Sequence, residues 1–192
     1  MIVGIVLAGG QATRMGGRDK ALLPLGSATV LDVLLARLAP QVSQVAVSAN
    51  GDAQRFARFG LPIIGDELRE AGPLAGVAAG LAWAARQGAN ALVTVPGDTP
   101  FIPRGLVDAL CPAPAWAESD GALHPLVAIW PVVLHERLAS WLQAGGSRRV
   151  RDFGIAAGMR TVPFAAEEEF FNINTPTDLA VAQGRVSALP PI

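Results

Sequence analysis

The chain has 192 residues, of which 51% are hydrophobic and 16% are charged, and its formal net charge is −1. This composition is typical of a well-buried globular domain and excludes a disordered chain, and the balanced charge excludes a basic field for nucleic acid over the whole protein. Every apolar run is interrupted before it reaches the length of a membrane span, and one cysteine with two histidines cannot build a zinc cluster, so any metal is expected to be a hard cation on oxygen ligands.

The first half of the chain alternates short apolar, β-branched runs with longer helical patterns. Strands are predicted over residues 2–7, 45–48, 61–65 and 91–95, and helices over residues 29–38, 53–59 and 73–86. This order predicts an α/β domain with a mostly parallel sheet and helices on both faces, and strands that are apolar throughout fit burial on both faces. Gly76 and Gly80, four residues apart, would let the third helix approach the sheet closely.

The rhythm of the pattern changes after Pro103. Helices are predicted over residues 104–110, 132–142 and 148–157, strands over 126–130, 161–164 and 170–173, and no clear period over 113–122. Thr175 is expected to cap a last helix that begins at Pro176, and the tail 183–192 is expected to fray. Because the sequence contains no repeat and no linker, residues 1–192 are predicted to form one domain.

A glycine-rich loop, GGQATRMGGRDK over residues 9–20, follows the first strand directly. Ligands of α/β proteins bind at the carboxyl ends of strands, glycines let backbone N–H groups approach a phosphate, and Arg14 and Lys20 could neutralise a triphosphate. The loop has neither the Gly-Lys-Ser/Thr ending of a P-loop nor the G-x-G-x-x-G pattern of a dinucleotide-binding turn. A solvated surface loop is the alternative, but glycines, arginine and lysine together at this place favour phosphate binding.

Asp98 follows another apolar strand, in the stretch VPGDTP over residues 95–100. A carboxylate there would face the same edge of the sheet as the glycine-rich loop, where it could hold Mg²⁺ between phosphates. A turn residue between two prolines is the alternative interpretation. The nearby loop makes us favour the metal role.

Asn50 and Asp66 also follow predicted strands and lie on the predicted ligand edge. An aspartate can accept hydrogen bonds from N1–H and the 2-amino group of guanine, which adenine cannot offer. Asn50-Gly51 is equally an ordinary turn dipeptide, and Asp66 could simply cap a loop.

Three polar residues in the second half are candidates for binding a polar ligand. Asn172 and Asn174 flank Ile173 and would project to the same side of an extended segment, although Asn174 could instead cap the last helix. His124, before the strand at 126–130, could equally be a turn histidine. The basic cluster of Arg148, Arg149 and Arg151 could be a solvated helix face or could meet an anionic ligand, and the sequence does not decide.

These motifs, in this order, resemble those of the molybdenum cofactor guanylyltransferases. The matching blocks are LAGG at 7–10, RMGGRDK at 14–20, GPLAG at 72–76, GDTP at 97–100, HPL at 124–126 and NINTP at 172–176, and together they span nearly the whole chain. The sequence departs from the family at Gly97, where the family often has cysteine; a small residue is kept, and we expect little effect. Residues 113–122 match no family block sharply.

The resemblance implies a Rossmann-like, three-layer nucleotidyltransferase fold. It also implies a Mg²⁺-dependent transfer of GMP from GTP to Mo-molybdopterin, which yields molybdopterin guanine dinucleotide and pyrophosphate without a protein nucleophile. Arg14, Lys20 and Asp98 would be the catalytic residues, with Asp98 on the metal, and His124, Asn172 and Asn174 would lie toward the pterin. The nucleotide would contact Leu7, Ala8, Gly9, Gly10, Lys20, Asn50, Asp66 and Asp98.

Two other functions compete with this interpretation. A CTP-using nucleotidyltransferase acting on molybdopterin or a sugar phosphate is the nearer one, but such relatives usually show Leu-Ala-Ala-Gly where Gly10 gives Leu-Ala-Gly-Gly here. A non-catalytic molybdopterin carrier is the other, and Lys20 together with Asp98 disfavours it. GTP and molybdopterin are the expected partners, proteins of molybdoenzyme maturation are a further class that the resemblance allows, and neither nucleic acid nor a membrane is expected. The lone Cys111 favours a reducing compartment, so the predicted location is the cytoplasm.

Overall fold

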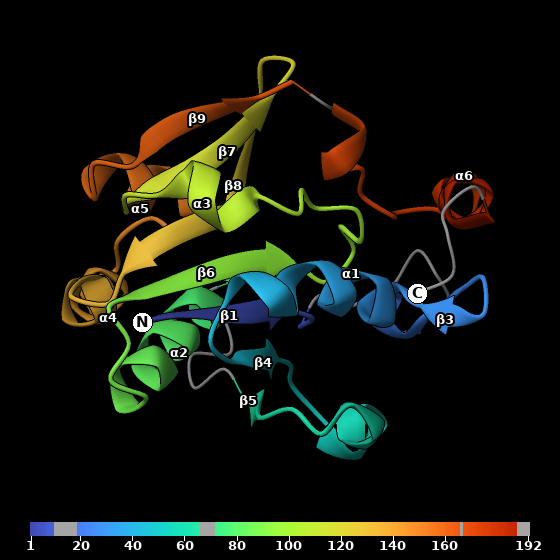
Figure 1. Ribbon diagram of the computed structural model, residues 1–192. Coiled ribbons are helices and arrows are strands. Elements are labelled where there is room, and N and C mark those ends of the chain that lie inside the picture. Colours follow the sequence, from blue (N-terminus) through green and yellow to red (C-terminus); the bar gives the residue numbers. More distant parts are fainter. Residues whose placement is uncertain (10–18, 66–71, 166, 188–192) are drawn as a thin grey trace.

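A seven-stranded sheet forms the centre of the protein in the computed structural model, which describes residues 1–9, 19–65, 72–165 and 167–187 (Figure 1). The strand order is β5-β4-β1-β6-β8-β7-β9. The strands are β1 (Ile2–Leu7), β4 (Val45–Ser48), β5 (Ile63–Ile64), β6 (Ala91–Pro96), β7 (Ala115–Ser119), β8 (Ala122–Pro131) and β9 (Arg160–Phe164). From β5 to β6 all neighbours are parallel, β8 runs antiparallel to β6 and β7, and β9 is parallel to β7. The predicted α/β class with a mostly parallel sheet is therefore confirmed.

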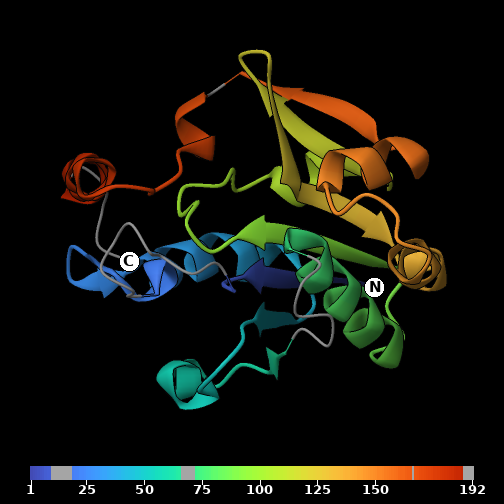
Figure 2. The same ribbon diagram turned by 180° about the vertical axis from the view of Figure 1, so that it is seen from behind.

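Helices cover both faces of the sheet (Figures 1 and 2). One core holds buried residues of α1 (Val30–Leu38), α3 (Leu106–Leu110) and the 3-10 helix η4 (Ala53–Phe59). The other holds residues of α2 (Pro73–Arg86), α4 (Leu134–Gln143) and α5 (Val150–Ala156). Ile5 and Val6, consecutive on β1, belong to opposite cores, as the alternation of side chains along a strand requires. Within the described residues, no helix combines the length and the apolar character needed to cross a membrane.

A third, smaller core lies between a short β-hairpin and the C-terminal segment. The hairpin β2 (Pro24–Leu25) and β3 (Ala28–Thr29) packs with the last helix, α6 (Pro176–Ser187), and the two lie side by side in both views (Figures 1 and 2). Phe101 and Ile173 are buried in this core. The segment before α6 is thereby brought back to the carboxyl ends of β1 and β6.

Local signals explain the two longest helices of the parallel half. Thr29 and Asp32 form a capping box at the start of α1. At the C-terminal end of α2, Gly88 has a φ of 67°, a conformation that favours glycine. A Cβ atom on Gly80 would lie only 2.9 Å from Cδ2 of Leu92, so the predicted close approach of α2 to the sheet is confirmed at Gly80.

Two segments differ from the sequence-based predictions. Residues 113–122, predicted without regular structure, contain β7. Only Trp116 of its five residues favours a strand, but the neighbouring strands β8 and β9 pair with β7 on both sides. The predicted strand at 170–173 is wrong: Phe170 ends the 3-10 helix η5 (Glu167–Phe170), and residues 171–174 have no regular structure. Phe170 packs against His124 there, and the N–H of Ile173 donates to the carbonyl of Asp98, so neither residue joins the sheet.

Most of the remaining differences concern where the predicted elements begin and end. The predicted strand at 61–65 is limited to β5, the predicted strand at 126–130 begins four residues earlier as β8, and the predicted helix at 53–59 is a 3-10 helix. The β2–β3 hairpin was not predicted. Residues 183–187, expected to fray, belong to α6. The other predicted helices are present with shifted ends.

Candidate active site

A cavity of about 480 Å³ opens at the carboxyl ends of β1, β4 and β6. The arrowheads of β1 and β6 in Figure 1 point toward this edge, on the side where α6 lies. This is the edge at which open α/β sheets bind ligands. The cavity is lined by Leu7, Ala8, Gly9, Asp19, Lys20, Ala21, Ser48, Asn50, Gly72, Pro73, Gly76, Pro96, Gly97, Asp98, Leu126 and Asn172.

Lys20 joins two predicted site residues from distant parts of the chain. It begins the 3-10 helix η2 (Lys20–Leu22), which Asp19 caps by accepting a hydrogen bond from the N–H of Ala21. Nζ of Lys20 lies 3.0 Å from Oδ2 of Asp98 and 2.6 Å from Oδ1 of Asn174, residues that follow it by 78 and 154 positions. The fold therefore brings a cation, a carboxylate and an amide oxygen together at the cavity.

Hydrogen bonds from three parts of the chain fix the loop that carries Asp98. The N–H of Gly97 donates to the carbonyl of Leu7 at 2.9 Å, and the carbonyl of Asp98 accepts from Ile173 at 2.9 Å. The N–H of Thr99 donates to the carbonyl of Pro96 at 3.2 Å, so the backbone forms a turn while the Asp98 carboxylate lines the cavity. The turn interpretation and the site interpretation of Asp98 are thus compatible.

Gly97 lies where the ends of β1 and β6 meet. A Cβ atom added there would lie 3.2 Å from the carbonyl oxygen of Leu7 and 3.4 Å from Cβ of Ala21. A slightly larger residue would therefore need a shift of a few tenths of an ångström, and a branched residue would need more. The requirement for a small residue before Asp98 follows from this close approach.

The start of α2 forms another wall of the cavity. Gly72, the N-cap residue with a φ of 60°, and Pro73 both line it. The N-terminus of a helix presents backbone N–H groups and a partial positive charge, which favour an anion. Together with the ammonium of Lys20, this end of α2 makes the cavity suited to phosphate groups.

The two asparagines of the C-terminal segment both reach the site. Asn172 lines the cavity and accepts a hydrogen bond from the hydroxyl of Thr99. The backbone N–H groups of Asn174 and Thr175 donate to Oδ2 of Asp178 at 2.9 and 2.8 Å, which caps α6. The backbone of Asn174 thus takes part in capping α6, while its side chain accepts a hydrogen bond from Lys20.

His124 lies beside the cavity without lining it. Its ring stacks on Phe170 with a centroid distance of 4.5 Å, and its Nε2 lies 2.7 Å from Oγ of Ser119. Burial lowers the pKa of His124, and the nearby carboxylate of Glu118 opposes that effect. Leu126, two residues further along β8, does line the cavity.

Three predicted site residues, Gly10, Arg14 and Asp66, lie outside the described residues. Of the others, Leu7, Ala8, Gly9, Lys20, Asn50, Asp98 and Asn172 line the cavity. The carbonyl of Leu7 and the N–H of Ala8 already bond to Gly97 and Ser48, and so hold the strand ends together.

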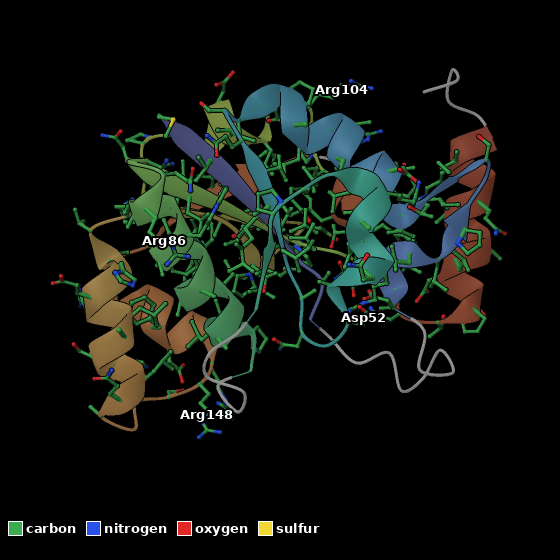
Figure 3. The ribbon with its side chains drawn as sticks, turned by 90° about the horizontal axis from the view of Figure 1, so that it is seen from below. Asp52, Arg86, Arg104 and Arg148 are labelled. Atoms are coloured by element: carbon green, nitrogen blue, oxygen red, sulfur yellow. The ribbon has the colours of Figure 1, made fainter. Side chains whose placement is uncertain are left out.

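Several residues that line the cavity were not predicted as site residues, among them Asp19, Ser48 and Leu126. The first two sit in a recognisable motif and at a predicted strand end, so the signal for them was present. Leu126 ends the HPL block at 124–126, but it reaches the cavity from an antiparallel strand, so the strand-end rule did not indicate it. The undecided basic cluster begins at Arg148, whose side chain extends outward at the start of α5 in Figure 3 and which does not line the cavity.

At the strand ends, one cavity is lined by a lysine, a carboxylate and the N-terminus of a helix. In an α/β protein, this arrangement is typical of nucleotide-binding proteins that transfer phosphate-containing groups. Within that class, the chain belongs to the MobA-like NTP transferase domain family, whose model matches residues 4–162. The family resemblance found in the sequence is confirmed.

Two relatives of similar length carry the same name. The chain is 49% identical to a molybdenum cofactor guanylyltransferase of Mesorhizobium japonicum, with 94% of each chain covered. It is 50% identical to a protein of the same name from Acidiphilium cryptum, with 93% of this chain and 92% of the relative covered.

Solved structures agree on the fold. The molybdopterin-guanine dinucleotide biosynthesis protein A of Archaeoglobus fulgidus superposes with a TM-score of 0.73 at 22% identity, over 98% of this chain and all of that one. The 2-C-methyl-D-erythritol 4-phosphate cytidylyltransferase of Thermus thermophilus superposes with a TM-score of 0.68 at 19% identity, over 95% of this chain and 98% of that one. The predicted nucleotidyltransferase type of fold is thereby confirmed.

Proposed function

We propose that this chain is a molybdenum cofactor guanylyltransferase, which transfers GMP from GTP to molybdopterin and releases pyrophosphate. The observation that carries the proposal is the contact of Lys20 with both Asp98 and Asn174 at the cavity. It occurs in a chain that is about half identical to relatives of that name over almost their whole length.

In the proposed reaction, an oxygen of the terminal phosphate of molybdopterin attacks the α-phosphorus of GTP. The new P–O bond forms as the bond from the α-phosphorus to the bridging oxygen breaks, and pyrophosphate leaves. The ammonium of Lys20 and the N-terminus of α2 would neutralise charge on the phosphates from two walls of the cavity. Their positioning of the two substrates, without a protein nucleophile, would supply the catalysis.

Asp98 fits a magnesium ion that is bound together with a triphosphate. The described residues contain no group of three or more His, Cys, Asp or Glu that could hold a metal by themselves. Mg²⁺ is usually bound by one or two carboxylates, with substrate phosphates and waters completing the octahedron, and Asp98 offers such a carboxylate in the cavity. When bound, the ion would supply further charge neutralisation to the phosphates.

The remaining roles follow the layout of the cavity. Asn50, after β4, is the proposed contact to the nucleoside, and Asp66 would read the guanine edge. Gly9, Gly10 and Arg14 would contribute to phosphate binding.

Asn172 and His124 are proposed for the acceptor side. Asn172 lines the cavity next to Thr99, and His124 lies on the same strand as the cavity residue Leu126. The proposed location is the cytoplasm, where the exposed thiol of Cys111 stays reduced.

Pyrophosphate release is the direct test. The purified chain is incubated with molybdopterin, MgCl₂ and each of the four NTPs in turn, and pyrophosphate and the dinucleotide product are measured. GTP alone should support both. Turnover with CTP instead would overturn the guanine assignment, and binding of GTP and molybdopterin without pyrophosphate release would identify a carrier.

A further inference from the structure

We infer that Arg55 is a positioning residue that couples the phosphate end of the cavity to its nucleoside end, an inference that rests on the proposed function. Arg55 lies in η4 and does not line the cavity. Its guanidinium nevertheless bonds to two residues that do, Asp19 and Asn50. It is therefore placed to act on the bound nucleotide through its neighbours.

The bonds of Arg55 reach two loops that carry different parts of the cavity. Nε lies 3.1 Å from Oδ2 of Asp19, the residue directly before Lys20. Nη2 donates to the carbonyl of Asn50 at 2.8 Å, and Nη1 donates to the carbonyl of Asp52 in the same loop. Figure 3 shows Asp52 where this loop leads into η4. One side chain thus fixes the end of the glycine-rich loop relative to the loop after β4.

The surroundings of Arg55 hold its guanidinium in place. The group lies over the ring of Phe56, 4.6 Å from the centroid, and Phe56 is fully buried. The side chains of Arg55 and Asp19 are only 28% and 14% exposed, so solvent screens their attraction less than it would at an open surface. Gly51, with a φ of 83°, turns the loop so that its carbonyls face the guanidinium. The planar guanidinium donates to these separate acceptors at the same time, and the single ammonium of a lysine cannot reproduce that geometry.

Arg58 provides a matched control within the same 3-10 helix. It pairs with Asp32 at 2.6 Å and lies over the ring of Phe59 at 4.1 Å, so it makes the same two kinds of contact as Arg55. Its polar partners, Thr29 and Asp32, belong to the capping box of α1 and do not line the cavity. Removing either arginine therefore costs one charge and one ion pair, but only Arg55 connects to the cavity.

The test compares GTP binding and turnover of the full chain with Arg55→Gln, Arg55→Lys and Arg58→Gln. Calorimetric titration with Mg-GTP should give a Kd raised roughly tenfold in Arg55→Gln, because displaced binding groups lose their alignment with the phosphates. Arg55→Lys should recover part of that loss, and Arg58→Gln should stay within about twofold of the wild type. KM for GTP should rise more than kcat falls, and thermal unfolding of each variant shows that the fold is kept.

A double-mutant cycle separates positioning from general destabilisation. If Arg55 acts through Asp19, Asp19→Asn combined with Arg55→Gln should bind GTP no more weakly than the more affected single variant. Wild-type affinity in folded Arg55→Gln, or equal losses in Arg55→Gln and Arg58→Gln, would overturn the inference while leaving the proposed function intact. If the wild type prefers another NTP, the guanylyl assignment fails, and the same variants are compared with that nucleotide. A wild type that binds no NTP would overturn both the proposed function and the inference about Arg55.

Discussion

Lys20 and Asp98, which both line the cavity, form an ion pair with Nζ 3.0 Å from Oδ2, although 78 positions separate them in the chain. Both side chains are 22% exposed, so solvent screens the pair and it contributes little to folding stability. Its proposed importance is for binding, because the ammonium and the carboxylate both line the cavity and lie within reach of one ligand. A triphosphate would attract the ammonium away from the carboxylate and leave Asp98 available to a cation.

Replacing Asp98 with Asn should strongly reduce transfer and preserve the fold. Asparagine keeps the shape of the side chain but removes the charge proposed to hold Mg²⁺, so kcat/KM should fall by about 100-fold or more. Because the ion pair is screened, Tm should change by no more than about 4 °C. Asp108→Asn, at an exposed position on α3, serves as the control. Normal turnover of Asp98→Asn at saturating Mg²⁺ would rule out the assigned role.

Asn174→Ala should weaken catalysis without unfolding α6. Only the side chain of Asn174 bonds to Lys20, whereas its backbone N–H keeps its bond to Asp178 in the variant. A hydrogen bond to a charged group typically contributes about 1.5 kcal/mol or more, so kcat/KM should fall roughly tenfold.

Thr175→Ala is the matched control for that experiment. Its hydroxyl accepts from the N–H of Asp178 at 3.2 Å, so the loss of this cap should lower the unfolding free energy by about 1 kcal/mol and leave kcat/KM unchanged. If instead Asn174→Ala lowers only stability, its side chain has no part in the site.

Much of the fold could be predicted from the sequence because local signals and burial agree there. The strand at 45–48 and the helix at 73–86 have the predicted bounds, since each is apolar and bounded by turn or capping residues. The segment 113–122 could not be predicted, because β7 depends on hydrogen bonds from β8 and β9 and not on its own propensity. The apolar run at 170–173 was mistaken for a strand because its residues are buried without pairing: Phe170 packs against His124 of β8 and Phe164 of β9, and Ile173 is buried in the third core.

The site could be predicted mainly where parallel strands end, and in part from the spacing of Asn172 and Asn174. Lys20, Asn50 and Asp98 all follow parallel strands, and the topology rule places them at one edge. The bond from Lys20 to Asn174 spans 154 positions, and no spacing in the sequence indicates it. Arg55 could not be predicted, because its proposed role depends on the position of η4 beside the glycine-rich loop and the loop after β4.

Gly154→Ala should destabilise the protein although alanine is the better helix former. A Cβ atom on Gly154, in α5, would lie 2.0 Å from Cζ3 of Trp116. Trp116 is 4% exposed and its Nε1 donates to Thr161 at 2.9 Å, so it cannot move aside without losing that bond. Overpacking of this kind typically costs about 1–3 kcal/mol, which urea unfolding would detect.

Gly184→Ala tests the same substitution without the clash. Among the described residues, no heavy atom beyond its chain neighbours and the backbone of its own helix lies within 4 Å of the position of a Cβ on Gly184, in α6. The unfolding free energy should therefore rise by about 0.5–1 kcal/mol, the usual advantage of alanine over glycine in a helix. Equal stabilisation by both substitutions would mean that Trp116 does not enforce the glycine at 154.

The contribution of His124 to stability should depend on pH with a defined sign. Burial against Phe170 lowers the pKa of His124 in the folded state below the 6.5 of a free histidine. The unfolded chain therefore takes up the proton first as the pH falls, so the contribution is complete above about pH 6.5 and declines below it. The free energy of urea unfolding is measured for the wild type and for His124→Gln at pH values from 8 to 5. The difference between the two isolates His124, because all other titratable groups are the same in both proteins. The advantage of the wild type should shrink toward acid pH; an advantage that stays constant or grows would show that the folded protein binds the proton as readily as the unfolded chain does.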